Sequence, residues 1–249
     1  MNVKIKLGLA GALLALFSAQ ASADAAAIKK SLGQILPTEE VDSIHETPIP
    51  GLFEVLLGTD LIYVSNDGRY MLQGRLIDLK SKEDLTENSP RLAEARKQEA
   101  KERVETIKKL GEDKMIVFAP ESGVKHTITV FTDVDCGYCR KLHAEIEGYK
   151  AEGIKVQYLL FPRAGLGSPS YDKSVSVWCA DDRRAALTDA KAGKSVPEKK
   201  CDNPVKEHME LGEKMGVSGT PAIILENGEL VPGFVPPKRL AAMLDEKQD

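Results

Sequence analysis

The sequence lacks a hydrophobic run long enough to span a membrane. Lys4 and Lys6 precede an apolar run from Leu7 to Phe17, which falls short of the ~20 residues that a spanning helix needs. The run is followed by Ala21-Ser22-Ala23, a small-residue pattern typical of signal-peptidase sites. We therefore predict a secretory signal peptide over residues 1–23, cleaved after Ala23, with a membrane anchor as the alternative interpretation.

The predicted leader contains no cysteine, so a lipid-anchored form is not indicated, and all four cysteines belong to the exported part. The chain also has no excess of basic residues, because 34 Lys and Arg stand against 38 Asp and Glu, a formal net charge of −4. This balance gives no indication of binding to nucleic acid or to an anionic membrane. An even number of cysteines in an oxidising compartment predicts disulfides.

The 249 residues show no internal repeat or low-complexity tract, and the length suits one large or two modest domains. Residues 24–84 begin with a helical stretch, Ala25–Ile35, that ends before Pro37. Strand-like runs with turn residues between the later ones follow at Val41–Glu46, Leu52–Leu57, Leu61–Ser65 and Tyr70–Leu79. We predict a small antiparallel α+β domain, which at this size buries little core alone and needs a partner surface.

Residues 85–112 are predicted to form a linker helix. Ser89-Pro90 is typical of a helix start, and no breaker follows until Gly111. The apolar residues of this stretch are sparse among charges, as in helices that bridge two folded segments through solvent. An ordinary surface helix packed on one domain remains the alternative.

Residues 113–249 are typical of an α/β domain. A strand, a helix and a strand with short connections predict a right-handed parallel unit. The predicted elements are strands at Met115–Ala119, His126–Phe131 and Ile154–Phe161, a helix at Cys136–Lys150, a helical insertion over about 165–215, a hairpin of Ala222–Leu225 with Glu229–Val231, and a last helix from Pro237.

The motif Cys136-Gly137-Tyr138-Cys139 lies between a predicted strand and the start of a predicted helix. Unpaired N–H groups and the dipole at a helix N-terminus favour a thiolate, so Cys136 is the candidate attacking group. Cys139, one turn further on, is expected to be more buried and to resolve the intermediate. The alternatives are a structural disulfide or a metal site.

Cys179 and Cys201 show no second Cys-x-x-Cys pattern, which makes a four-cysteine zinc site unattractive. A structural disulfide closing the helical segment is the preferred interpretation. Thr220-Pro221 comes directly before a predicted strand. It is either a simple strand entry or a cis bond whose exposed backbone faces the cysteine pair and binds an extended substrate.

Several motifs together resemble the DsbC/DsbG family of periplasmic disulfide isomerases in the thioredoxin superfamily. They are Phe131-Thr132-Asp133, the Cys136–Cys139 motif, Phe161-Pro162-Arg163, Trp178-Cys179-Ala180, Gly216–Pro221, Val231-Pro232-Gly233 and Pro236-Pro237. The resemblance is strong from about Lys114 to the end and rests on layout alone in the N-terminal part.

The resemblance implies a homodimer in which a cystatin-like N-terminal domain dimerises, a linker helix follows and a thioredoxin-fold domain carries a helical insertion. It implies that Cys136 is the nucleophile, Cys139 the resolving thiol, Pro221 cis, and Cys179 with Cys201 a structural disulfide. It also implies that the protein acts in the periplasm on misfolded, disulfide-containing secreted proteins, and that a membrane thiol reductant of the DsbD type keeps it reduced. No cofactor or metal is expected.

Two other functions stay open: a DsbG-like thiol reductase and chaperone that protects single cysteines, and a monomeric oxidant. Tyr138 is expected to contact substrate together with Thr220 and Pro221. A chaperone that grips unfolded chains overlaps with the isomerase.

The chain departs from thioredoxin itself at the sixth position before the first cysteine, where Val130 replaces a buried carboxylate. The proton acceptor for Cys139 is therefore not identified by the sequence. Asp133 and Asp135 are expected to be solvated loop acids. His143 is expected to have a packing role, because it lies two turns, ~10 Å, along the helix from Cys136. His45, His126 and His208 belong to no recognisable constellation.

Overall fold

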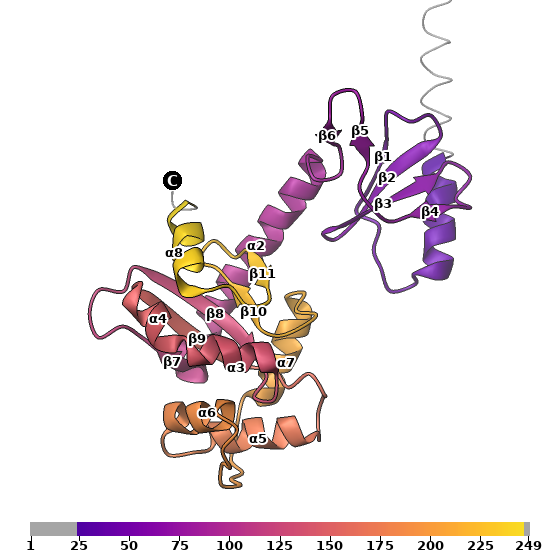
Figure 1. Ribbon diagram of the computed structural model, residues 1–249. Coiled ribbons are helices and arrows are strands. Elements are labelled where there is room, and N and C mark those ends of the chain that lie inside the picture. The colour runs from indigo at the N-terminus through magenta and orange to yellow at the C-terminus, as the bar shows by residue number, and fades with distance from the viewer. Residues whose placement is uncertain (1–23, 247–249) are drawn as a thin grey trace, which may run out of the picture. The chain divides into compact units, whose positions relative to one another are not determined.

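The computed structural model describes residues 24–246, and the predicted signal peptide therefore lies outside the described residues. The chain divides into two compact units, with the boundary between Gln98 and Glu99. Each unit has a sheet and a hydrophobic core of its own (Figure 1).

The N-terminal unit is a helix over residues 24–35 and an antiparallel sheet in the order β1-β2-β3-β4. The strands are β1 (Ser43–Glu46), β2 (Leu52–Leu57), β3 (Asp60–Ser65) and β4 (Met71–Leu72). A separate two-stranded sheet joins β5 (Ile77–Asp78) to β6 (Glu83–Asp84). The predicted single strand Tyr70–Leu79 is therefore wrong: β4 and β5 belong to different sheets, so the chain has to turn between them, and Gly74 lies in that turn.

The two faces of the main sheet are both covered. Alternate side chains of β2 and β3, which point to opposite faces, divide between two clusters. One cluster joins Val55 and Ile62 to Ile28 and Leu32 of the first helix. The other joins Leu56, Leu61 and Tyr63 to Leu92 of helix α2 (Pro90–Leu110).

Helix α2 contributes to the cores of both units, and neither sequence-based alternative described this. Leu92 in its first turn belongs to the N-terminal core. Ile107 and Leu110 near its end pack against a core of the second unit. Arg103, which is only 8% exposed and belongs to the second unit, donates hydrogen bonds to the Met215 and Gly228 carbonyl oxygens of the same unit.

The second unit is built on a five-stranded sheet in the order β11-β10-β8-β9-β7 (Figure 1). Strands β8 and β9 are parallel, as predicted, and the other pairs are antiparallel. The strands are β7 (Ile116–Phe118), β8 (His126–Thr132), β9 (Ile154–Leu160), β10 (Ala222–Ile224) and β11 (Leu230–Pro232), and a short 3-10 turn, η1 (Glu112–Lys114), precedes β7.

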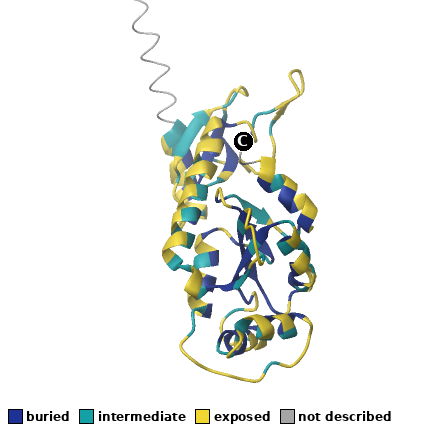
Figure 2. Ribbon diagram, turned by 90° about the vertical axis from the view of Figure 1, so that its left-hand side faces the viewer, coloured by how far each residue is buried: buried dark blue, intermediate teal, exposed yellow. Residues whose placement is uncertain are grey.

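Helices cover both faces of this sheet. On one face α3 (Gly137–Ala144), α4 (Ile146–Ala151) and α8 (Pro237–Glu246) join Val130 and Tyr158 in a core. On the other face α7 (Val205–Lys214) and the end of α2 pack against Phe131 and Leu159. Figure 2 shows the central strands mostly in the buried colour and the outer surfaces of the helices exposed.

The prediction of one helix over Cys136–Lys150 is wrong, because the segment forms two helices, α3 and α4, that are separated at Glu145. Leu142, Ile146 and Tyr149 have the i, i+4, i+7 spacing of one helical face, and all three belong to one core, so the apolar face continues across the interruption.

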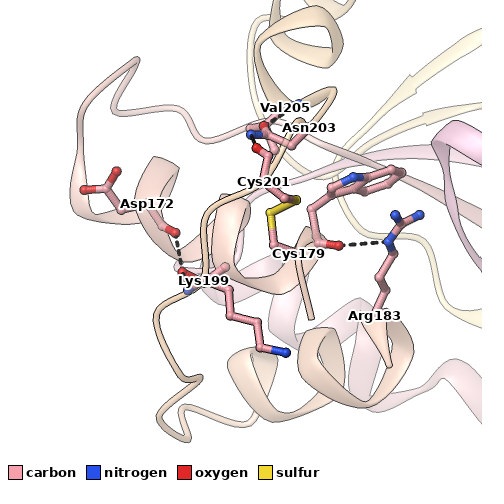
Figure 3. The surroundings of a disulfide bond; sticks show 9 residues. Asp172, Cys179, Arg183, Lys199, Cys201, Asn203 and Val205 are labelled. Carbon is pink, nitrogen blue, oxygen red and sulfur yellow. Dashed lines mark hydrogen bonds between the residues drawn. A yellow bond between two sulfur atoms is a disulfide. The ribbon is translucent and has the colours of Figure 1, made fainter. Parts of the chain in front are cut away.

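The helical insertion consists of α5 (Pro169–Trp178), α6 (Arg183–Lys191) and α7. Figure 3 shows the disulfide that joins Cys179, at the end of α5, to Cys201 in the segment before α7. This disulfide confirms the preferred interpretation of these two cysteines. Next to it, Arg183 donates to the Trp178 carbonyl and lies 3.8 Å from the Trp178 ring centroid.

Candidate active site

The cysteine pair lies where β8 gives way to helix α3. Cys136 is the N-cap of α3, and Cys139 lies in its first turn. Both thiols are free, with 4% of Cys136 and 0% of Cys139 exposed, so the expected order of burial is confirmed. After Cys136 the buried residues Cys139, Leu142 and Ile146 recur every three or four positions, which is the spacing of a helical face.

The surroundings of Cys136 favour its thiolate. Burial opposes ionisation, but the Cys139 backbone N–H at the helix start, the side chains of Thr220 and Cys139, and the positive charge of Arg163 together hold the pKa of the Cys136 thiol below its ordinary value. This is the direction expected at a helix N-terminus. Cys136 is therefore the better nucleophile of the two at neutral pH.

Cys139 behaves in the opposite way. Burial raises the pKa of its thiol, and the ammonium of Lys191 and a hydrogen bond from the Thr132 side chain offset this only in part. The outer thiol therefore ionises more readily than the inner thiol.

The Thr220–Pro221 peptide bond is cis, as the resemblance implied. Antiparallel pairing of β10 with β8, which places Ala222 opposite Phe131, brings this bond to the cysteine pair. The Cys136 thiol donates a hydrogen bond to the Thr220 carbonyl at 3.2 Å. The Thr220 hydroxyl is buried without an ordinary hydrogen-bond partner in the described chain, yet it lowers the pKa of both thiols.

Tyr138, between the two cysteines, is 66% exposed. Its ring is therefore accessible beside the outer thiol, which is compatible with the expected contact to substrate. That contact stays a prediction.

The expectation that Asp133 is a solvated loop acid is wrong. Only 3% of the residue is exposed, and its carboxylate accepts hydrogen bonds from Ser170 Oγ at 2.5 Å and from the backbone N–H of Arg163 at 3.0 Å and of Asp135 at 2.9 Å. Burial opposes ionisation, but these bonds and the Arg163 charge keep the pKa of Asp133 below its usual value. Asp133 thereby holds Arg163, whose charge also favours the Cys136 thiolate. Asp135 is exposed, as expected.

His143 has a packing role, as expected. It is 4% exposed, contacts Tyr158 Oη at 3.2 Å and Thr188 Oγ1 at 3.0 Å, and has a pKa lowered to about 4 by burial and by the charge of Lys191. His208 is a second buried histidine that no sequence pattern identified. Its Nδ1 accepts from the Leu160 backbone N–H at 3.1 Å, and its other nitrogen lies 2.9 Å from the Lys114 carbonyl oxygen.

Lys191 is the residue at this site that sequence reasoning missed. It lies in the last turn of α6, is 4% exposed, and points toward the end of β8. A lysine in a charged helical stretch is ordinarily a surface residue. Only the packing of α6 against α3 shows that this one is buried.

Within residues 24–246 no group of three or more His, Cys, Asp or Glu side chains is arranged to hold a metal ion. Among the same residues no helix is long and apolar enough to cross a membrane.

A thioredoxin-like sheet with a Cys-x-x-Cys pair at a helix start, facing a cis-proline, defines a thiol–disulfide oxidoreductase. Comparison with known proteins agrees with this class. One family model, the thioredoxin-like domain, matches residues 112–248, and another, the N-terminal domain of disulfide bond isomerase proteins, matches residues 19–87.

The thiol:disulfide interchange protein DsbC of Escherichia coli strain K12 is 41% identical over 239 residues, which cover 95% of this chain and 94% of that protein. DsbC of Haemophilus influenzae is 37% identical and covers 94% of this chain and 96% of its own. A crystal structure of a disulfide interchange protein from Neisseria gonorrhoeae matches with a TM-score of 0.50 and 33% identity, over 56% of this chain and 99% of that one. The chain belongs to the DsbC family of thiol:disulfide interchange enzymes.

Proposed function

We propose that this protein is a disulfide isomerase that rearranges incorrect disulfides through a mixed disulfide at Cys136. The observation that carries the proposal is the position of the Cys136 sulfur, at the N-terminus of α3 and 3.2 Å from the Thr220 carbonyl oxygen. The thiolate attacks one sulfur of a substrate disulfide, a Cys136–substrate bond forms, and the other substrate sulfur leaves as a thiolate.

Two routes release the substrate. A substrate thiolate can displace Cys136, which closes a different disulfide and restores the starting enzyme. Alternatively Cys139 attacks Cys136, which releases reduced substrate and leaves the cysteine pair oxidised. The high pKa of Cys139 favours the first route, because the inner thiol is mostly protonated while the mixed disulfide lasts.

Thr220, Pro221 and Tyr138 are proposed to hold the substrate segment. Once Cys136 ionises it no longer donates to the Thr220 carbonyl, which is then available to accept an N–H from an extended chain. The exposed ring of Tyr138 supplies apolar contact beside the reacting sulfur.

The homodimer is proposed to form through residues 24–84. Five of the exposed large apolar side chains of this unit lie within one stretch of sequence: Tyr70, Met71, Leu72, Ile77 and Leu79. They lie on or next to the two-residue strands β4 and β5 at the edges of small sheets, where a second copy can cover them. Residues 85–112 would then link the dimerisation domain to the catalytic domain at residues 113–249.

The predicted leader and the family support a periplasmic location and misfolded secreted proteins as substrates. Because the second release route leaves the cysteine pair oxidised, a thiol reductant has to regenerate the reduced pair, and in the family pattern this is a membrane protein of the DsbD type. No nucleic acid or cofactor enters the proposal.

The test is the refolding of a scrambled multi-disulfide protein in the presence of the full mature chain, compared with its Cys136→Ala and Cys139→Ala variants. We expect recovery with the parent, none with Cys136→Ala, and trapped adducts at Cys136 with Cys139→Ala. Reduction of substrates without rearrangement would instead support the thiol-reductase function. A monomer by sedimentation would contradict the dimer.

A further inference from the structure

Lys191 is buried behind the resolving cysteine. Its Nζ donates to Thr132 Oγ1 at 2.6 Å and to the Asp133 carbonyl oxygen at 2.8 Å. Both partners are neutral groups, and an ammonium buried against neutral partners is costly for folding. If Lys191 served stability alone, an apolar side chain would suit this buried position better. The presence of a charged ammonium here therefore needs another explanation.

Thr132 connects this ammonium to Cys139. A lysine ammonium has only donors, so the Thr132 oxygen must accept from Lys191. The single hydroxyl hydrogen of Thr132 is then left for another acceptor. Cys139 lies in the first turn of α3, directly after β8, and the Thr132 side chain is one of the groups that favour its thiolate. Lys191 and Thr132 therefore both lie where they can act on the Cys139 sulfur.

The electrostatics of the pair agree with this geometry. Burial lowers the pKa of Lys191 to about 8, and the charge of Cys139 is the largest influence in the opposite direction. Reciprocally, Lys191 is the largest influence that opposes the effect of burial on Cys139. The other titratable or charged groups around the pair are Cys136, Arg140 and His143 on α3, Asp133 after β8, Tyr158 on β9 and Arg163 after it.

We propose that Lys191 is a positioning residue for the resolving step, which orients the Thr132 hydroxyl toward Cys139 and offsets the negative charge of the Cys139 thiolate. This inference rests on the proposed function, in which Cys139 attacks the mixed disulfide. Lys191 does not replace the buried carboxylate for which this chain has Val130, because an ammonium offsets the thiolate charge and accepts no proton.

The step balances as follows. Cys139 loses its proton to solvent, and its thiolate attacks Cys136. The Cys139–Cys136 bond forms and the Cys136–substrate bond breaks, so the pair is oxidised and the substrate reduced. The departing thiolate takes a proton from solvent. Lys191 keeps its proton throughout and acts only on the stability of the thiolate.

The experiment follows one mixed disulfide through formation and release. The full mature protein is mixed with oxidised glutathione, quenched with acid at set times and analysed by mass spectrometry. We compare the parent with Lys191→Met, which removes the charge, and with Lys194→Met as the matched control, since Lys194 is exposed and pairs with Asp189.

We expect Lys191→Met to slow release about tenfold at pH 7, because an opposite charge near a thiol shifts its pKa by at least about one unit. The pH profile of release is expected to move to higher pH, while formation of the adduct changes much less and Lys194→Met behaves as the parent. Release at the parental rate and pH profile would overturn the role of Lys191. Absence of any adduct in the parent would instead overturn the proposed function, so the two failures are distinguishable.

If Lys191→Met does not fold, Thr132 provides the second test. Thr132→Val removes the hydroxyl at nearly constant shape, and Thr132→Ser retains it. Slow release in the valine variant with near-parental release in the serine variant supports the action of the Thr132 hydroxyl on Cys139. Equal rates in both would overturn it, because a purely structural Thr132 has no need of its hydroxyl for release.

Discussion

Acid is expected to unfold the catalytic unit through two of its buried histidines, His143 and His208. His143 and His208 are 4% and 0% exposed, and burial is the main cause that lowers the pKa of each from 6.5 to about 4. In the unfolded chain both take up a proton near pH 6.5, whereas in the folded chain they do so only near pH 4. The unfolded state therefore binds more protons in this window, and stability falls as the pH drops from 6.5 to 4.

The magnitude follows from the pKa difference. Lowering a pKa by roughly 2.5 units, at about 1.4 kcal/mol per unit, corresponds to about 3–4 kcal/mol for each histidine. Two such groups remove about 7 kcal/mol, a large part of the 5–15 kcal/mol that typically stabilises a domain. Above pH 7 the effect vanishes because both states are then neutral.

The assay is urea unfolding at several pH values between 4 and 7, followed by the fluorescence of Trp178. This is the only tryptophan of the chain, is 4% exposed and lies in the catalytic unit, so the signal reports on that unit. His143→Gln and His208→Gln are each expected to reduce the slope of unfolding free energy against pH by about 1.4 kcal/mol per unit. Buried carboxylates add to the slope equally in parent and variants.

The reasoning is refuted if both variants lose stability on acidification as steeply as the parent. A variant too unstable to measure leaves the parent itself as the test. Nuclear magnetic resonance titration of its histidines would then have to find two that remain neutral down to about pH 4. Titration of both near 6.5 would show that their burial does not affect protonation.

Three further changes have definite expected outcomes. Gly212→Ala places a Cβ 2.6 Å from the Phe161 ring and is expected to lower the unfolding free energy of the catalytic unit by about 1–3 kcal/mol; a midpoint equal to the parent's would contradict the close contact. Gly68 has φ +69°, and a Cβ there would lie 2.6 Å from Ser31 Oγ, so Gly68→Ala is expected to destabilise the N-terminal unit. Gly58 also has a positive φ, but a Cβ there would meet open space, so Gly58→Ala serves as the control for the effect of φ alone. Replacement of both Cys179 and Cys201 by alanine is expected to lower the free energy of unfolding by about 3 kcal/mol, because the unfolded chain gains loop entropy. In the parent, treatment with a mild dithiol followed by alkylation is expected to label Cys136 and Cys139 alone. Labelling of all four cysteines would refute this expectation.

The sequence by itself determined the features that depend on local chemistry. The Cys136–Cys139 motif at a helix start, the hairpin at Asn227-Gly228 and the proline before a strand were each predictable, since helix starts and tight turns need particular residues within a few positions. The antiparallel N-terminal strands followed from the turn residues between them. Their division at Gly74 did not, because which sheet a strand joins depends on distant partners.

Only the tertiary structure decided which polar residues are buried and what they contact. Asp133, Lys191 and His208 are polar residues, which are ordinarily solvated. Ser170 of α5 covers Asp133, packing of α6 against α3 buries Lys191, and packing of α7 against β9 buries His208. Burial depends on how the layers of helices and strands pack together, and the pKa values of the two cysteines depend on burial. These pKa values therefore could not be predicted from any short stretch of the sequence.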